Sequence, residues 1–167
     1  MSFKIRNFFF KTTEKDDKKI KYDTKSEDWI IKGEKYANQN NLKEAIRCFD
    51  MALNLDQKND LALGDKALIL DKLEKHNEAL LLFSQALNIN PSNPITWHNK
   101  GLTFARMNKL EDSIDCFNKA IDLKKDYAKA WYNKGRCLEK LGDIKKSQEC
   151  LNTAKKLDPF LFTKIKR

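Results

Sequence analysis

The side chains that could perform catalysis or bind a metal ion are few in this sequence of 167 residues. The cysteines are Cys48, Cys116, Cys137 and Cys150, and the histidines are His76 and His98. No two cysteines form a CxxC pair, whereas zinc sites are typically built from such closely spaced ligands. The sequence therefore predicts neither a metal site nor a cofactor.

Motifs of catalytic sites are missing as well. The sequence contains no Gly-rich phosphate loop, no nucleophile elbow and no His–acid pair at metal-ligand spacing. His76 is expected in a turn, and His98 alone does not make a catalytic triad. The paired acids Asp16 and Asp17 lie in a charge-dense segment that reads as a linker. We predict that the protein is not an enzyme.

The cysteines are better explained by packing. Cys48, Cys116 and Cys150 share one position of the repeat described below, where a thiol acts as a small apolar group in a reducing compartment. Cys137 and Cys150 could approach each other across a helix pair, so a disulfide between them is the alternative.

No apolar run approaches the roughly 20 residues that span a bilayer, and no cleavage site of a signal peptide is evident. A cytoplasmic location is expected.

The net charge of +9 raises the question of a nucleic-acid partner. The excess is concentrated at the two ends of the sequence, because residues 1–25 and 143–167 each carry +4 and residues 26–142 carry only +1. A protein that wraps nucleic acid more often has a continuous basic face. Solvated basic ends are therefore the favoured interpretation, and an RNA-binding helical repeat is the lesser alternative.

Residues 1–25 differ in composition from the rest. Residues 1–11 combine phenylalanines with Lys4, Arg6 and Lys11, and their periodicity fits a helix or a strand equally well. Residues 12–25 are dense in charge and are expected to form a mobile linker. The segment Phe3–Phe10 with its basic neighbours suggests an alternative function as a membrane-surface adaptor.

From Ser26 onward the sequence repeats with a period of 34 residues. Each copy opens with a large residue and has a small residue four positions later, and a second group of small and aromatic residues follows. The openers are Trp29, Leu63, Trp97 and Trp131; the small residues are Gly33, Ala67, Gly101 and Gly135; the second group is Ala45, Phe49 and Ala52, then Ala79, Phe83 and Ala86, then Ser113, Phe117 and Ala120, then Ser147, Leu151 and Ala154. These spacings place each group on one face of a helix.

Residues between the two groups predict the turn of a helix hairpin. These are Asn40, Glu74, Asn108 and Gly142, and Gly and Asn readily take the left-handed conformation that ends a helix. Asn93 before Pro94 is a good helix cap, and Asp60 and Asp126 could serve similarly. Each copy is therefore predicted to be a helix, a tight turn and an antiparallel helix.

This pattern resembles the tetratricopeptide repeat (TPR) family, which implies an all-α, right-handed superhelical solenoid of four units and about eight helices. The predicted array spans residues 26–161, with units 26–59, 60–93, 94–127 and 128–161. Residues 1–25 form an N-terminal arm and residues 162–167 a basic tail. One departure occurs in every copy: a lysine (Lys32, Lys66, Lys100 or Lys134) stands where the family commonly has leucine. Its stem could lie along a helix, or the four could form a basic ladder for an acidic partner.

The resemblance also implies that the first helix of each pair lines a concave groove that binds peptides. The implied groove residues are Leu68, His98, Asn99, Leu102, Arg106, Lys129, Tyr132, Asn133 and Arg136, together with Glu27, Ile30, Ile31, Glu34, Ala37, Leu61, Gly64, Asp71, Ile95 and Glu139. They run from acidic and apolar in the first copy to polar and basic in the last. They predict a protein or peptide partner with acidic and apolar residues, unless they are ordinary exposed helix residues.

A carboxylate clamp of the kind that chaperone-tail binders of the family use does not fit, because only Asn99 and Lys129 match its pattern. The last repeat is followed by FLFTKIKR, which is too short for a full capping helix. Part of the last pair could be covered by Phe160, Leu161, Phe162 and Ile165. Alternatively, the open end could pair with another copy, or the Phe-rich residues 3–10 could dock on exposed apolar surface. The favoured function is a non-catalytic scaffold for protein interactions.

Overall fold

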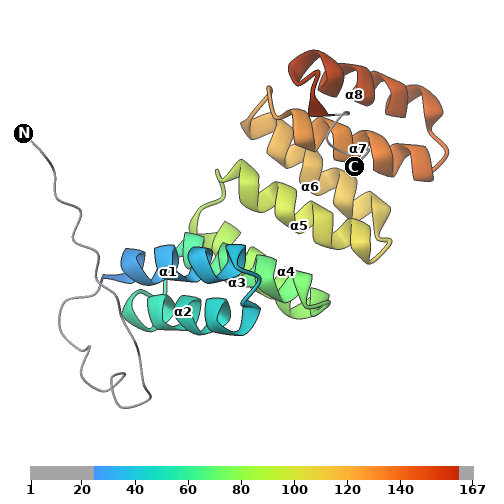
Figure 1. Ribbon diagram of the computed structural model, residues 1–167. Helices are drawn as coiled ribbons and strands as arrows, with labels where there is room; N and C mark the ends of the chain where they lie inside the picture. Colours follow the sequence, from blue (N-terminus) through green and yellow to red (C-terminus); the bar gives the residue numbers. More distant parts are fainter. Residues whose placement is uncertain (1–24, 162–167) are drawn as a thin grey trace, which may run out of the picture.

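The computed structural model describes residues 25–161, which form eight α-helices and no strand. The helices are α1 (Ser26–Asn38), α2 (Leu42–Leu55), α3 (Asp60–Lys72), α4 (His76–Ile89), α5 (Pro94–Arg106), α6 (Leu110–Leu123), α7 (Ala128–Lys140) and α8 (Ile144–Leu157). They follow one another in order along an elongated array (Figure 1). The predicted all-α solenoid is confirmed.

The helices pack as four hairpins, α1–α2, α3–α4, α5–α6 and α7–α8, and each hairpin packs on the next through its even-numbered helix. Neighbouring odd-numbered helices also contact one another along the array, whereas neighbouring even-numbered helices make no comparable contact among the described residues. The odd-numbered helices are therefore closer together, which places them on the inner, concave side of the curved stack.

The predicted turn residues end the first helix of every hairpin. Asn40, Glu74 and Asn108 have φ of 59°, 63° and 58°, and Gly142 has φ of 85°. This left-handed conformation costs little for Gly and is tolerated by Asn, but it is unfavourable for a residue such as Glu74. The α3–α4 turn is therefore the one in which a residue that disfavours the left-handed conformation occupies the left-handed position.

The starts of the helices were predicted less well. Asn93 caps α5 as expected, since its side chain accepts hydrogen bonds from the backbone of Ile95 and Thr96. Asp60, however, is the first residue of α3, and Asn59 supplies the cap. Tyr127 rather than Asp126 stands at the cap position of α7. His76 is the first residue of α4, so its placement in the turn was wrong.

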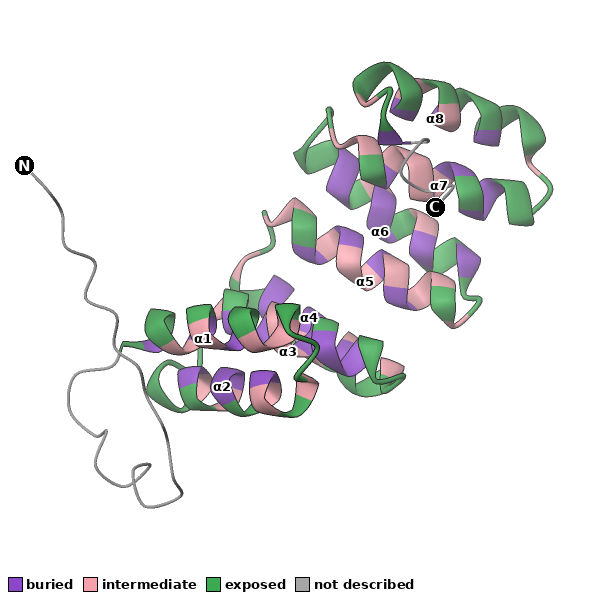
Figure 2. Ribbon diagram, in the orientation of Figure 1, coloured by how far each residue is buried: buried purple, intermediate pink, exposed green. Residues whose placement is uncertain are grey.

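The core lies between the two helices of each hairpin, where Figure 2 shows the buried residues facing neighbouring helices. Phe49, Phe83 and Phe117 are fully buried. A Cβ atom added to Gly33 would lie 2.6 Å from the Phe49 ring, and one added to Gly101 would lie 2.8 Å from the Phe117 ring. The absence of a side chain at these glycines thus permits the close approach that the sequence pattern predicted.

The repeated lysines have partners that the sequence did not reveal. The ammonium groups of Lys32, Lys100 and Lys134 lie 4.7, 5.6 and 5.4 Å from the ring centroids of the tryptophans three residues before them. These are cation–π contacts. The second hairpin has Leu63 in place of Trp, and there Lys66 binds the Asp50 carboxylate at 2.6 Å instead. The lysines are therefore held by contacts within the array.

The two outermost helices differ from the inner ones at the positions that join hairpins. On α3, α5 and α7 these positions hold buried residues: Ala62 and Ile69, Thr96 and Thr103, and Ala130 and Cys137. The equivalent residues of α1 are the exposed Asp28 and Lys35. At the other end, α8 exposes Gln148 and Lys155, where the inner even-numbered helices have Ile46 and Leu53, Leu80 and Leu87, and Ile114 and Ile121. Both ends of the stack are therefore polar.

All four cysteines are buried free thiols, so the alternative of a Cys137–Cys150 disulfide is not realised. After α8, Leu161 is buried and Phe160 is exposed. Phe162 and the residues that follow it, like the arm of residues 1–24, lie outside the described residues. None of the helices in the described part is long and apolar enough to cross a membrane.

Candidate functional site

The exposed side of the odd-numbered helices forms one continuous surface. Four positions on each helix, spaced four, three and four residues apart, point away from the core because this spacing returns to the same side of a helix. We call the sixteen residues at these positions the groove surface: Glu27, Ile31, Glu34 and Asn38 on α1; Leu61, Asp65, Leu68 and Lys72 on α3; Ile95, Asn99, Leu102 and Arg106 on α5; and Lys129, Asn133, Arg136 and Lys140 on α7.

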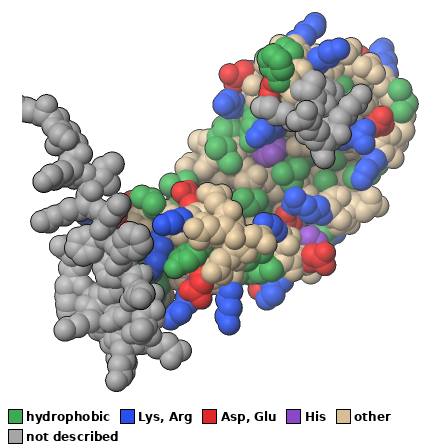
Figure 3. Space-filling view, in the orientation of Figure 1, with side chains coloured by type: hydrophobic (Ala, Val, Ile, Leu, Met, Phe, Trp, Pro, Cys, Tyr) green, Lys and Arg blue, Asp and Glu red, His purple; other side chains and the backbone are tan. Residues whose placement is uncertain are grey.

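The charge of the groove surface changes steadily from one end to the other. The four residues of α1 carry two acids, those of α3 one acid and one base, those of α5 one base, and those of α7 three bases. Figure 3 shows Lys and Arg side chains interspersed with hydrophobic ones on the face that is viewed. The groove surface can therefore attract cations at its first helix and anions at its last.

The aliphatic residues of the groove surface lie on its first three helices, and four of the five are on α3 and α5. Ile31, Leu61, Leu68 and Ile95 are large aliphatic residues that are between 39% and 64% exposed. Leu102, on the next helix, is half-buried. Exposed aliphatic side chains gathered on one face are typical of a surface that binds another molecule.

Two carboxylates interact at the acidic end. Burial, followed by the nearby negative charge of Glu34, raises the pKa of Asp65 to about 6. Asp65 occupies the position that Asn99 and Asn133 occupy on α5 and α7. A charged carboxylate therefore stands where the other two hairpins have a neutral amide.

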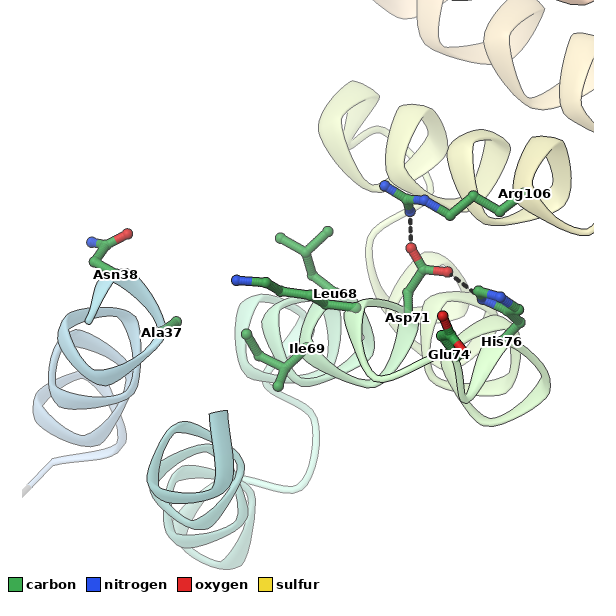
Figure 4. A pocket seen from close by; sticks show the side chains of 9 residues that line it. Ala37, Asn38, Leu68, Ile69, Asp71, Glu74, His76 and Arg106 are labelled. Atoms are coloured by element: carbon green, nitrogen blue, oxygen red, sulfur yellow. Dashed lines mark hydrogen bonds and ion pairs between the residues drawn. The ribbon is translucent and has the colours of Figure 1, made fainter. Parts of the chain in front are cut away.

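A buried carboxylate joins the second hairpin to the third at the edge of the groove surface. The Asp71 side chain is 1% exposed and accepts hydrogen bonds from His76 Nδ1, at 2.8 Å, and from the Arg106 guanidinium. Figure 4 shows Asp71 of α3 between these two side chains, which come from α4 and α5. Asp71 is thus a structural residue, and Arg106 already holds a carboxylate of the protein itself.

A pocket of about 730 Å³ lies beside this cluster. Its lining includes Leu68, Lys72 and the Asp71–His76–Arg106 contact, together with Ala37 and Asn38 from the end of α1 (Figure 4). Lys72 is held by Asn40, whose side-chain oxygen lies 2.8 Å from its ammonium. The pocket is wide enough for a side chain of a bound peptide and has an apolar wall with basic groups at its rim.

His98 is buried, at 5% exposure, between α5 and α7. Its Nε2 lies 2.9 Å from the Asn133 side-chain nitrogen and accepts a hydrogen bond from it. Its ring also contacts Phe117 and Tyr127, with centroids 5.6 and 5.0 Å away. Burial is the main cause that lowers the pKa of His98 to about 4. The ring is therefore neutral and joins the third hairpin to the fourth.

The side chains at the basic end of the groove surface, on α7, are more exposed to solvent than Asp71 and His98. Lys129 and Arg136 are exposed, and Tyr132 is half-buried. The Arg136 guanidinium lies 2.7 Å from a Glu139 oxygen on the same helix. Because this ion pair is exposed to solvent, it is weak and can exchange for another carboxylate.

The structure thus brings most of the expected site residues onto one surface. Leu68, Asn99, Leu102, Arg106, Lys129, Asn133 and Arg136 belong to the groove surface, and Tyr132 lies at its edge, while His98 lies beneath it. Asp65 and Lys72 were not anticipated. Asp65 could have been found from its alignment with Asn99 and Asn133. Within the described residues, no three His, Cys, Asp or Glu side chains gather as metal ligands would.

Three stretches of the chain match known protein families in sequence. The TPR repeat matches residues 101–142, and the tetratricopeptide repeat matches residues 62–93 and 128–161. No curated protein matches the sequence.

Solved structures share the arrangement of helices. A crystal structure of MamA superposes with a TM-score of 0.74 at 18% identity, covering 85% of this chain and 81% of that one. The structure of pilF from Pseudomonas aeruginosa gives 0.76 at 17% identity, over 80% and 61% of the two chains. The first TPR of Spaghetti (RPAP3), bound to the HSP90 peptide SRMEEVD, gives 0.68 at 22% identity, over 74% and 98%. At these identities the likeness concerns the fold.

Proposed function

Because the chain belongs to the tetratricopeptide repeat family, we propose that it is a non-catalytic scaffold that binds a peptide or protein segment along the groove surface. The proposal includes the division into an arm (1–25), four units (26–59, 60–93, 94–127 and 128–161) and a tail (162–167), and a cytoplasmic location. It needs no cofactor, because binding in such a groove uses only side chains and backbone of the two partners.

One observation supports this function most: the groove surface combines exposed aliphatic side chains, mostly on α3 and α5, with a charge that changes sign along its length. A partner segment with apolar side chains at its centre would bury Leu61, Leu68 and Ile95. Its acidic residues would face Lys129 and Arg136, where charge-assisted hydrogen bonds can form. One protein of the same fold holds an acidic peptide, SRMEEVD, which supports a ligand of this chemistry.

The alternatives have less support. An RNA partner would need a long basic stripe, but the net positive charge of the groove surface is concentrated on α7. Self-association through the end of the array would bury the polar Gln148 and Lys155 of α8. The membrane-adaptor alternative concerns residues 3–11, which lie outside the described residues.

The test is to reverse the charge at the basic end in the full-length protein. The variant Lys129→Glu/Arg136→Glu should bind a labelled synthetic peptide of leucine and glutamate at least about tenfold more weakly, which corresponds to about 1.4 kcal/mol. The control Lys145→Glu/Lys156→Glu changes the net charge equally on exposed residues of α8 and should bind like the unaltered protein. Fluorescence anisotropy gives the affinities, and circular dichroism checks that helix content is retained.

Equal weakening in both variants would mean that the peptide senses only net charge, and no weakening in either would mean that it binds elsewhere. Either result would contradict the proposed groove. A pull-down with the unaltered protein and with the groove variant, compared by mass spectrometry, would then identify natural partners that depend on Lys129 and Arg136.

A further inference from the structure

The acidic end of the groove surface has no complement in the acidic and apolar partner proposed above. Glu27 and Glu34 are exposed on α1, and Asp65 is half-buried on α3. Ile31 and Leu61 lie among them and are more than half exposed. These three acids and two aliphatic residues fit a ligand that is basic and apolar at once.

We propose that residues 3–11 of the same chain, FKIRNFFFK, bind this acidic end of the groove surface and act as an internal competitor of the partner. This inference rests on the proposed function, because it assigns a regulatory segment to the same surface. The segment contains three basic residues (Lys4, Arg6 and Lys11), no acid, and five large apolar residues (Phe3, Ile5, Phe8, Phe9 and Phe10). Its charge is equal and opposite to that of Glu27, Glu34 and Asp65.

The length of the intervening chain allows this contact. Residues 12–25 connect the segment to α1, and 14 residues span at most roughly 50 Å when extended. The helix α1 has 13 residues and is about 20 Å long. The other basic segment, residues 162–167, follows α8 at the opposite end of the array, and six residues reach only roughly 20 Å. The N-terminal segment is therefore the one that can cover α1 and α3.

Tethering makes even a weak contact effective. A segment joined to its site by a short stretch of the same chain has an effective concentration on the order of millimolar, so an intrinsic dissociation constant in the same range would already fill half of the sites. A cation placed between Glu34 and Asp65 would also relieve the repulsion between these carboxylates, which helps to raise the pKa of Asp65 to about 6.

The consequence is competition for the aliphatic residues of the groove surface. Phenylalanines that cover Ile31 and Leu61 would overlap with the part of the partner that contacts Leu68 and Ile95. The partner's apparent affinity falls in proportion to the fraction of molecules whose groove is free. If the segment occupied the groove nine-tenths of the time, its removal would strengthen partner binding about tenfold.

The experiment compares the full-length protein with the full-length variant Phe8→Ser/Phe9→Ser/Phe10→Ser. In ¹⁵N–¹H spectra, amide signals of α1 and α3 should differ between the two proteins, whereas those of α7 should coincide. A synthetic peptide with the sequence of residues 3–11, added to the variant, should move the same signals back. Identical spectra, or differences confined to other helices, would overturn the inference.

Two further variants show whether the acidic residues of α1 are responsible for binding residues 3–11. Glu27→Lys/Glu34→Lys, added to the Phe8→Ser/Phe9→Ser/Phe10→Ser background, should abolish the effect of the peptide. The control Asp115→Lys/Glu149→Lys, which alters exposed acids of α6 and α8, should leave the effect unchanged. If the signals of α1 and α3 changed with protein concentration, the segment would be binding a second copy, and the internal contact would be refuted.

The leucine–glutamate probe separates this inference from the proposed function. Tighter probe binding by the Phe8→Ser/Phe9→Ser/Phe10→Ser variant than by the unaltered protein supports both. Probe binding that depends on Lys129 and Arg136 but is equal in the two proteins would refute only the internal competitor. Spectral changes at α1 and α3 without any binding of the probe would refute only the proposed acidic partner.

Discussion

The first two hairpins, α1–α4, and the last two, α5–α8, share one framework but place different polar groups inside it. In α1–α4 these groups include two carboxylates, of which Asp71 is buried and Asp65 is half-buried. In α5–α8 they include the neutral ring of His98 and the hydroxyl groups of Thr103 and Ser113. The comparison teaches that the repeat fixes where the helices lie, while the inner positions remain free to set charge. The change of charge along the groove surface has a separate origin, because it is set by exposed residues of the odd-numbered helices.

The largest predicted difference between the halves is their response to acid. His98 has a pKa lowered to about 4 from 6.5, so the unfolded chain binds a proton first as pH falls. The free energy of unfolding therefore falls by about 3 kcal/mol as the pH decreases from about 6.5 to about 4. Asp65 has a pKa raised from 3.8 to about 6, so the folded state binds the proton first. Protonation of Asp65 at low pH therefore raises the free energy of unfolding, by about 2 kcal/mol after allowance for the partial exposure of its side chain.

Hydrogen exchange at pH 7 and pH 5, corrected for intrinsic rates, measures the two halves separately. Protection of α5 and α7 should fall on acidification relative to that of α1 and α3. The variant Asp65→Asn, which copies the residue of the later hairpins, should be more stable at pH 7 and should remove the acid response of the first half. Parallel changes in both halves would contradict the assignment of the response to these two residues.

A smaller difference is predicted at the helix-crossing glycines. Gly101→Ala should destabilise the protein by roughly 1–3 kcal/mol, because the new Cβ would lie 2.8 Å from the rigid Phe117 ring. At Gly135 the nearest atoms belong to the aliphatic side chain of Leu151, at 3.0 Å, but the backbone oxygen of Ser147 also lies only 3.2 Å away. The higher helix propensity of alanine, about 1 kcal/mol, acts at both positions, so Gly135→Ala should destabilise the protein less than Gly101→Ala because Leu151 can move.

Urea denaturation followed by circular dichroism gives both free energies of unfolding. Similar losses for Gly101→Ala and Gly135→Ala would show that Leu151 is held as firmly as Phe117, and the distinction between the third and fourth hairpins would disappear.

The smallest effect is expected at the turns. Glu74→Gly should stabilise the second hairpin by about 0.5–1 kcal/mol, because glycine adopts φ near 63° without steric cost. In the fourth hairpin the reverse change, Gly142→Ala, should cost about 1 kcal/mol through the backbone alone, since no atom lies within 4 Å of the added Cβ. Thermal unfolding of the two variants checks the opposite signs. A lower melting temperature for Glu74→Gly would indicate that the Glu74 side chain contributes to the α3–α4 turn.

The features that sequence reasoning predicted are those that depend on short spacing. The helices, the left-handed turns at Asn40, Asn108 and Gly142, and the close contact at Gly101 all arise from residues within one repeat. The hydrogen bond between His98 and Asn133 instead joins residues that lie 35 positions apart. The pairing of Asp71 with Arg106 spans the same separation. Such contacts depend on the angle between successive hairpins, which the pattern of a single repeat does not specify.

The polar residues on the outermost helices have a consequence for how the number of units is encoded. Identical hairpins that stack through apolar faces form, in principle, a polymer without a preferred length. Here Asp28 and Lys35 at one end, and Gln148 and Lys155 at the other, withdraw the apolar contact that each inner hairpin offers its neighbour. The absence of an apolar stacking face on the outermost helices is thus due to these four side chains and not to the repeat pattern that the hairpins share.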